Sequence, residues 1–323
     1  MKSRDKPTLI SIFFNEIVCF MQGDIQITRL LDRKLRKKKG FSHPFYNYIS
    51  IIFMEKRGVY IMEITSKTES VVVKYEGHVA TVMVNRPEVL NALDEPTLKE
   101  LLQKLKEVAE SSAHIVVLCG NGRGFSAGGD IKSMLSSNDE SKFDGIMNTI
   151  SEVVVTLYTM PKLVISAIHG PTAGLGLSIA LTADYVMADI SSVIAMNFIG
   201  IALIPDGGGH FFLQKRVGEN MTKQIIWEGK KLSATEALDI GLIDEVIGED
   251  FQTAVKQKIN EWSQKPIKAM IQTKQILCEV NRSNLEQTLQ LEKRGQYAMR
   301  QTADHKEGIA AFLEKRLPAF KGE

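Results

Sequence analysis

Short apolar runs separated by turns extend through the middle of the chain. Two valine-rich runs, residues 71–75 and 79–84, flank a Glu-Gly-His turn at 76–78, and this arrangement predicts a β-hairpin. Further apolar runs at 115–118 and 163–168 are short and lie between turn residues, which is typical of buried strands. The pattern therefore predicts a sheet built from short strands.

Helical periodicity fills the intervals between these runs. Asp94 caps a predicted amphipathic helix, whose apolar face is formed by Leu98, Leu101, Leu102, Leu105 and Val108. Residues 143–158 predict a second amphipathic helix, and residues 174–183, apolar almost all round, predict a buried one. Strand, turn and helix recur with a coarse period, which favours a coil of similar units over a doubly wound sheet, although spacing alone does not decide between them.

Beyond about residue 249 the strand pattern ends and helical periodicity continues. Helices are expected over residues 255–262, 267–280, 285–299 and 309–317. We therefore divide the chain after residue 61 into a core, residues 62–249, and a helical carboxy-terminal region, residues 250–323. A helical region without strands of its own often packs on the core or on another subunit.

The first 61 residues differ in charge from the rest. They carry a net charge of +7, against −5 for residues 62–323. Arg57-Gly58 can be encoded by purine-rich codons of the kind that a bacterial ribosome binds, shortly before Met62. We therefore expect residues 1–61 to be an extension outside the native protein, with Met62 as its start. A solvated tail and a basic arm for nucleic acid or membrane surfaces are the alternatives.

The sequence lacks the residues that several classes of protein require. The apolar stretch 9–21 is shorter than the roughly 20 residues of a membrane span. Cys19, Cys119 and Cys278 lie far apart without metal-binding spacing, which predicts free thiols in a reducing cytoplasm. No glycine loop continues into a dinucleotide-binding or phosphate-loop pattern. No metal, nucleic-acid or membrane partner is therefore expected.

Two glycine-rich turns offer the clearest chemistry. Residues 125–130 read Phe-Ser-Ala-Gly-Gly-Asp and residues 169–176 read His-Gly-Pro-Thr-Ala-Gly-Leu-Gly; each follows an apolar run and precedes helical patterning. Two backbone N–H groups can therefore converge on one oxygen. Fixed donors of this kind stabilise the enolate-like charge that develops on a thioester carbonyl, because they need no reorganisation during the reaction.

Five motifs resemble those of the crotonase, or enoyl-CoA hydratase/isomerase, superfamily, and they occur in the same order along the chain as in that family. They lie at residues 85–93, 122–131, 167–170, 183–184 and 200–208. The resemblance spans nearly all of residues 62–321 and implies an α/β fold, a spiral of ββα turns with a helical C-terminal trimerisation region. It also implies a cytoplasmic homotrimer or dimer of trimers that binds an acyl-CoA thioester. No metal or redox cofactor is implied, CoA being part of the substrate.

Carried over by position, the resemblance assigns backbone roles to the glycine turns. The N–H groups of Ala127 and Leu175 are expected to form an oxyanion hole for the thioester. The residues expected to line the bent CoA are Ala127, Gly128, Gly129, Asp130 and Ile131.

The chain departs from the family's hydratase pattern. Ser178 and Phe198 stand where hydrating members have two glutamates, so paired acid–base activation of water lacks its carboxylates. The remaining carboxylate is Asp206. Its Ile-Pro-Asp-Gly-Gly context and the sequence at 302–313 are similar to the branch that contains the phenylacetate-pathway epoxyacyl-CoA isomerase. One carboxylate suffices to move a proton, so we predict an enoyl-CoA double-bond isomerase with Asp206 as its catalytic residue.

Other interpretations of these residues stay open. A hydratase could use Asp206 with Ser178 to position water, and a non-catalytic protein could bind acyl-CoA without reaction. Asp206 is also a candidate N-cap for a helix beginning at Gly207. Helix packing, turn hydrogen bonds or contacts to CoA are the alternative roles for Ser178, His169, His210, Asp130 and Asp184.

Overall fold

The computed structural model describes residues 49–56, 59–66, 69–131 and 140–323 of a chain that divides into two compact units, residues 1–68 and 69–323. The described part of the first unit is an antiparallel hairpin of β1 (Ile49–Lys56) and β2 (Val59–Ser66), in which Phe53 lies opposite Met62. The predicted start at Met62 therefore falls inside β2. Residues 1–48, with the apolar stretch 9–21 and Cys19, lie outside the described residues, and the extension stays a prediction.

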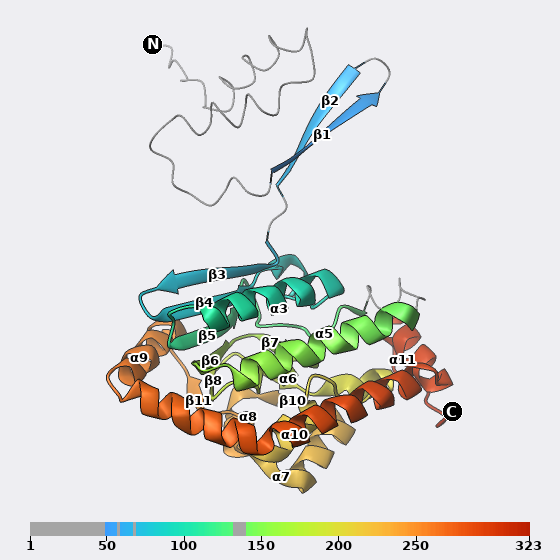
Figure 1. Cartoon of the computed structure of the whole chain (residues 1–323). Coiled ribbons are helices and arrows are strands. Elements are labelled where there is room, and N and C mark those ends of the chain that lie inside the picture. The colour runs from blue at the N-terminus through green and yellow to red at the C-terminus, as the bar shows by residue number, and fades with distance from the viewer. Residues whose placement is uncertain (1–48, 57–58, 67–68, 132–139) are drawn as a thin grey trace, which may run out of the picture. The chain divides into compact units, whose positions relative to one another are not determined.

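The predicted hairpin at the start of the second unit opens a six-stranded sheet (Figure 1). Its first two strands pair antiparallel, and every later strand joins in parallel. In spatial order the strands are β11 (Glu245–Ile247), β8 (Tyr185–Asp189), β6 (Leu163–Ile168), β5 (Ile115–Gly120), β4 (Val79–Val84) and β3 (Val71–Glu76). Every residue of β6 is buried, because parallel strands are covered on both faces.

A second, smaller sheet is formed by short strands, two of which lie in the sequence between a strand of the first sheet and a helix. Its strands, in spatial order, are β10 (Lys231–Ser233), β9 (Val193–Ala195) and β7 (Pro171–Ala173). Two parallel bridges, Ser126 to Thr172 and Leu93 to Gly129, extend this layer. Strand, short extended segment and helix thus repeat along the chain, in agreement with the predicted coil of similar units.

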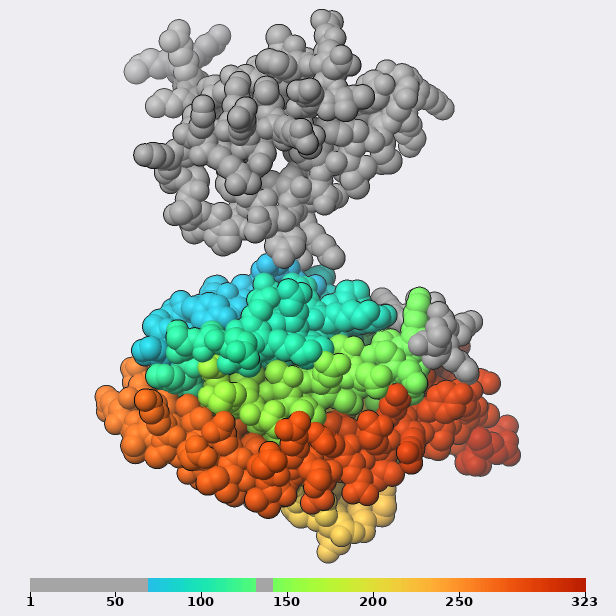
Figure 2. Space-filling model, viewed as in Figure 1, coloured from blue at the N-terminus to red at the C-terminus, as the bar shows by residue number. Residues whose placement is uncertain are grey.

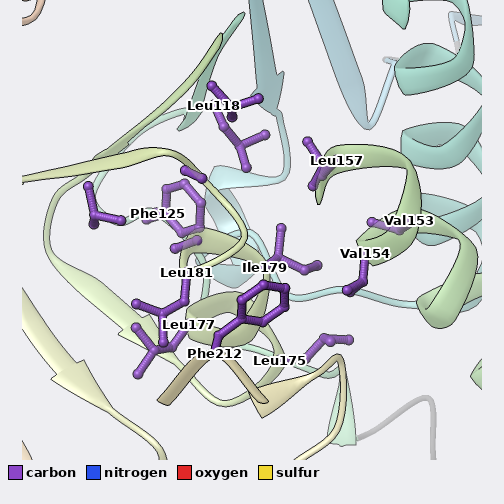
Figure 3. Packing of buried hydrophobic residues seen from close by; sticks show 14 of the residues in the cluster. Leu118, Phe125, Val153, Val154, Leu157, Leu175, Leu177, Ile179, Leu181 and Phe212 are labelled. Atoms are coloured by element: carbon purple, nitrogen blue, oxygen red, sulfur yellow. The ribbon is translucent and has the colours of Figure 1, made fainter. Parts of the chain in front are cut away.

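Amphipathic helices pack on these units. α3 (Glu95–Glu110) begins after Asp94, whose side chain accepts a hydrogen bond from the Thr97 N–H at 2.9 Å, as its sequence predicts. α5 (Glu140–Thr159) and the buried α6 (Leu175–Ala180) meet in the main apolar cluster, in which Figure 3 shows side chains from both helices. Full burial of such a side chain stabilises the fold by about 1.5–3 kcal/mol.

Helices dominate the rest of the chain. The helices not yet named are the 3₁₀ helices η2 (Pro87–Val89) and η3 (Asn197–Ile201), and the α-helices α7 (Gly209–Glu228), α8 (Ala234–Asp239), α9 (Phe251–Ser263), α10 (Ile267–Arg300) and α11 (Ala303–Glu314). Two separate helices were expected where the structure has the single α10. Their polar junction, residues 281–284, contains neither Gly nor Pro, so nothing interrupts the backbone hydrogen bonds. α10 consequently runs unbroken along the second unit beside α5 (Figure 1, Figure 2).

The described part of the chain contains no helix that is both long and apolar enough to cross a membrane.

Gly170 lies two residues after the end of β6, where two backbone segments pack closely. Its φ is +52°, and an added Cβ would overlap the backbone carbonyl oxygen of Arg123. We expect Gly170→Ala to lower the free energy of unfolding by about 2–4 kcal/mol, because the strain combines with a backbone clash. The matched control is Gly145→Ala in α5, where a Cβ meets nothing within 4 Å and alanine should add about 0.5–1 kcal/mol. Urea unfolding measures both variants, and equal stabilities would contradict the prediction.

Candidate active site

The two glycine turns lie in direct backbone contact. A Cβ on Gly128 would lie 2.7 Å from the carbonyl oxygen of Ala173 and 3.4 Å from the nitrogen of Leu175. A Cβ on Gly176 would lie 2.6 Å from the Cβ of Ser126. Side chains at these glycines would force the turns apart, so the glycines allow the expected convergence of the two segments.

The first turn makes one backbone donor available, and it is not the expected one. The Ala127 N–H donates to the carbonyl oxygen of Leu90 at 2.9 Å, and the Gly128 N–H donates to Ser126 Oγ at 3.1 Å. The Gly129 N–H has no acceptor among residues 69–131 and 140–323. The structure therefore replaces Ala127 by Gly129 as the candidate oxyanion donor, because the Ala127 donor is already used within the fold.

A parallel bridge explains why the Gly129 donor is free. The Leu93 N–H donates to the carbonyl oxygen of Gly128 at 2.8 Å, and the Asp130 N–H donates to the carbonyl oxygen of Leu93 at 3.1 Å. In an extended segment, successive N–H groups point to opposite sides. The donor of Gly129, between these two bonded groups, consequently points away from Leu93.

The second turn contains Leu175, the other donor proposed from the sequence. Leu175 is the first residue of α6, and the first N–H groups of a helix have no partner inside the helix. The described residues offer the Leu175 N–H no other acceptor. The partial positive charge at the helix N-terminus adds to the attraction for an anionic oxygen.

Both turns line a cavity of about 450 Å³ in the second unit. Side chains of α5, α10, α11 and η3 complete its walls. The residues expected to line CoA all line this cavity, namely Ala127, Gly128, Gly129, Asp130 and Ile131. The free N–H groups of Gly129 and Leu175 therefore belong to one cavity of a size that suits a small acyl group.

Asp206, between η3 and α7, presents a carboxyl group to the same cavity. Its Oδ1 is inaccessible to solvent and has no hydrogen-bond partner in the described chain, while its Oδ2 lies 3.5 Å from Nε2 of Gln296. Burial raises the pKa of Asp206 to about 8, and the negative charge of Glu292 adds to the increase. The group is thus able to hold or release a proton near neutral pH.

Glu292, a residue that the sequence did not single out, caps α7 in place of Asp206. Its carboxylate reaches from α10 and accepts hydrogen bonds from the N–H groups of Gly208 at 2.7 Å and His210 at 3.1 Å. The Nδ1 of His210 lies 2.8 Å from the same carboxylate. The N-cap residue of α7 is Gly208, and no nearby side chain caps the helix. The alternative prediction, that Asp206 is the N-cap, is therefore wrong. Glu292 is 84 residues from Gly208, beyond the reach of any local capping pattern.

Ser178 and Phe198 occupy apolar surroundings. Ser178 is fully buried, and its Oγ lies 3.5 Å from the carbonyl oxygen of Gly174 and 3.9 Å from the sulfur of Met196. The ring of Phe198 lines the cavity and lies 3.7 Å from where a Cβ of Gly174 would be. Neither side chain supplies a proton carrier for water, since a hydroxyl in packing contact and a phenyl ring do not titrate near neutral pH.

The remaining candidates form structural contacts. Nε2 of His169 lies 2.9 Å from the carbonyl oxygen of Gly122, which is a turn contact of the expected kind. Asp184 pairs with Lys274 at 2.8 Å and accepts a hydrogen bond from the Val164 N–H at 2.7 Å. These residues hold loops and strands together rather than facing the cavity.

No cluster of His, Cys, Asp and Glu within the described ranges has the arrangement of a metal site. Cys119 and Cys278 are both free thiols. Burial raises the pKa of the Cys119 thiol to about 11, which keeps it protonated and unreactive.

Comparison with known proteins identifies the family. The family model for enoyl-CoA hydratase/isomerase matches residues 74–323. YhaR of Bacillus subtilis, which carries an enoyl-CoA hydratase/isomerase name, is 50% identical over 245 residues, covering 76% of this chain and 96% of YhaR. The crystal structure of an enoyl-CoA hydratase from Mycobacterium avium subsp. paratuberculosis matches with a TM-score of 0.72 at 30% identity, covering 78% of this chain and 98% of that one. The chain therefore belongs to the enoyl-CoA hydratase/isomerase family, whose members act on acyl-CoA thioesters.

The expected branch within this family is a weaker match than the family itself. The 1,2-epoxyphenylacetyl-CoA isomerase of Escherichia coli is 31% identical over 253 residues, covering 77% of this chain and 97% of that enzyme. This identity is well below the 50% shared with YhaR. The comparisons thus support the family and the crotonase-like fold, and not that particular branch.

The raised pKa of Asp206 predicts a pH-dependent cost in stability. An acid whose pKa rises on folding loses its contribution to stability as pH increases from its ordinary pKa of 3.8 to about 8. We expect Asp206→Asn to become more stable than the wild type across this interval, by a few kcal/mol at pH 8 and above, with little difference below pH 4. Urea unfolding of both proteins over this range measures the change. A stability difference that is independent of pH would contradict it.

Proposed function

We propose that the protein is an enoyl-CoA double-bond isomerase. The observation that carries this proposal is one cavity lined by Gly129, Leu175 and Asp206. Among the described residues, the N–H groups of Gly129 and Leu175 have no acceptor and one oxygen of Asp206 has no partner. The donors would bind the thioester oxygen as an oxyanion hole. Asp206 would be the single catalytic acid–base group.

The proposed reaction moves one proton between two carbons. The Asp206 carboxylate removes a proton from the α- or γ-carbon, and the electron pair delocalises onto the thioester oxygen as a dienolate. The N–H groups of Gly129 and Leu175 stabilise that negative charge. Asp206 then returns the proton to the other carbon, so that the double bond shifts and nothing is consumed. A pKa near the working pH favours both directions of transfer.

The other acids that line the cavity are engaged with cations. Asp94 lies 3.0 Å from Arg86, and Asp130 lies 3.7 Å from the same guanidinium. Glu95 pairs with Lys99 at 2.7 Å. Each of these three carboxylates is paired with a cation, whereas Asp206 lies beside the neutral amide of Gln296, which supports Asp206 as the proton carrier.

Two alternatives are outcomes of the same test. A hydratase would need a second group that positions water, and the contacts of Ser178 and Phe198 favour the isomerase over it. A protein that only binds acyl-CoA would need no proton carrier, so the destabilising burial of the Asp206 carboxyl would have no functional explanation.

An assembly into a homotrimer or a dimer of trimers is part of the proposal. Large apolar side chains on the outer face of α10 support it, since Ile276, Leu277 and Val280 are 57%, 59% and 73% exposed. The free thiols of Cys119 and Cys278 support a reducing, cytoplasmic setting.

Replacement of Asp206 tests the proton carrier. We expect wild-type protein to shift the double bond of 2-enoyl-CoA and 3-enoyl-CoA in deuterated water with deuterium incorporation. Asp206→Asn should slow this exchange by about 10²–10⁴-fold, because the amide cannot accept and return the proton. Ser178→Ala is the matched control and should change the rate little. Time courses by NMR and absorbance measure both; net water addition would favour the hydratase, and binding without exchange the non-catalytic protein.

Replacement of Leu175 tests the oxyanion hole without deleting the helix. Proline is tolerated at the first position of a helix, where the missing N–H has no helical partner. Leu175→Pro should therefore keep α6 and lower kcat about 10²–10³-fold, the loss expected for one oxyanion donor. Leu175→Ala retains the N–H and controls for the lost packing of the side chain. Equal kcat values for the two variants would argue against this donor.

A further inference from the structure

Arg300 brings a cation to the cavity from the end of α10. Its side chain is partly buried and lines the cavity, and its guanidinium carbon lies 5.0 Å from the centre of the Phe143 ring. Arg300 follows Gln296 by one helical turn, which places it about 6 Å further along the helix axis. Because Gln296 lies beside Asp206, Arg300 is close to the part of the cavity where the acyl group would react.

The guanidinium of Arg300 has no acidic partner among residues 69–131 and 142–323. The acids that follow it in the chain are used elsewhere. Asp304 accepts hydrogen bonds from the N–H groups of Lys321 and Gly322 at 2.7 Å each, and Glu307 pairs with Arg316. The side chain of Arg300 is partly buried, and this burial lowers the pKa of Arg300 because it removes part of the charge from water.

Asp206 does not neutralise this charge either. Among the described residues, Oδ1 of Asp206 has no hydrogen-bond partner and Oδ2 lies 3.5 Å from Nε2 of Gln296, so neither oxygen pairs with Arg300. The acid–base group and the guanidinium thus occupy separate positions in one cavity. Apolar side chains line the cavity with them, among them Phe143, Ile146, Ile201 and Phe312.

We infer that Arg300 binds a carboxylate at the distal end of the acyl chain, so that the preferred substrates are acyl-CoA thioesters whose acyl group ends in a second carboxylate. The apolar wall would hold the methylene groups, and the guanidinium fork would pair with the carboxylate. The inference rests on the proposed function in one respect, that this cavity holds an acyl-CoA thioester.

A phosphate of CoA is the other source of an anion. The position of Arg300 favours the acyl carboxylate, because Arg300 lies one helical turn from Gln296, whose Nε2 is 3.5 Å from Asp206, and its guanidinium packs against the Phe143 ring. Lys142 also lines the cavity, and a phosphate, with more charge and more acceptor oxygens, would engage it together with Arg300.

Binding of saturated thioesters tests the inference without turnover. Calorimetry compares adipoyl-CoA with hexanoyl-CoA, which has the same chain length but ends in a methyl group, and free CoA serves as a third ligand. The same comparison is made with succinyl-CoA against butyryl-CoA and suberoyl-CoA against octanoyl-CoA. For the chain length that reaches Arg300, the carboxylated ligand should bind about ten- to a hundredfold more tightly, as expected for a charge-assisted hydrogen bond.

Variants of Arg300 assign that preference to the guanidinium. Arg300→Met should abolish the preference while leaving the affinity for free CoA unchanged, and Arg300→Lys should retain part of it. Arg294→Met is the matched control, since Arg294 lies on the same helix, is exposed and does not line the cavity. It should behave as the wild type.

Three results would overturn or separate the claims. Equal loss of affinity for free CoA and for every thioester in Arg300→Met would assign the guanidinium to a CoA phosphate and overturn the inference. Wild-type protein without any preference for carboxylated chains would overturn it without reliance on a variant. Retained preference in a protein that shows no proton exchange would support the inference while refuting the proposed isomerase.

Discussion

Backbone contact between the two glycine turns is the constraint on which the whole site depends. Gly128 and Gly176 leave no room for a Cβ against the opposite turn. This close approach lets the smaller sheet continue through the Ser126–Thr172 and Leu93–Gly129 bridges. The bridges engage the neighbouring donors and leave those of Gly129 and Leu175 for a ligand. A site made from backbone groups also explains how Leu175 can carry a buried side chain without loss of the donor.

α10 brings three different functions to one face. Glu292, Gln296 and Arg300 follow one another at four-residue intervals, which places them along the same side of the helix. The first caps α7, the second lies beside Asp206 and the third lines the cavity with its guanidinium. Because α10 is unbroken, the cap of α7 and the cationic end of the cavity are held by a single rigid element. The negative charge of Glu292 also links this helix to the raised pKa of Asp206.

Asp206 breaks the rule that buried polar atoms find partners. Its Oδ1 is inaccessible to solvent and has no hydrogen bond within the described chain, an arrangement that costs stability. Such exceptions concentrate at functional sites, where a group must remain free for a ligand or a proton. Because Glu292 caps α7, Asp206 does not have the N-cap role that its position in the sequence suggested. Glu292 therefore has the structural role, and Asp206 is left as the candidate acid–base group.

The sequence by itself determined the elements whose signals are local. The hairpin at 71–84, the Asp94 cap and the two glycine turns follow from apolar periodicity and from turn residues, which act over a few neighbours. Only the tertiary structure decided which groups stay free. Ala127 and Gly129 are two residues apart, yet Leu90 occupies the donor of the first and the bridge to Leu93 directs the second away. Likewise, the cap of α7 comes from α10. Whether a donor or a carboxyl is available depends on what packs against it, and that partner is distant along the chain.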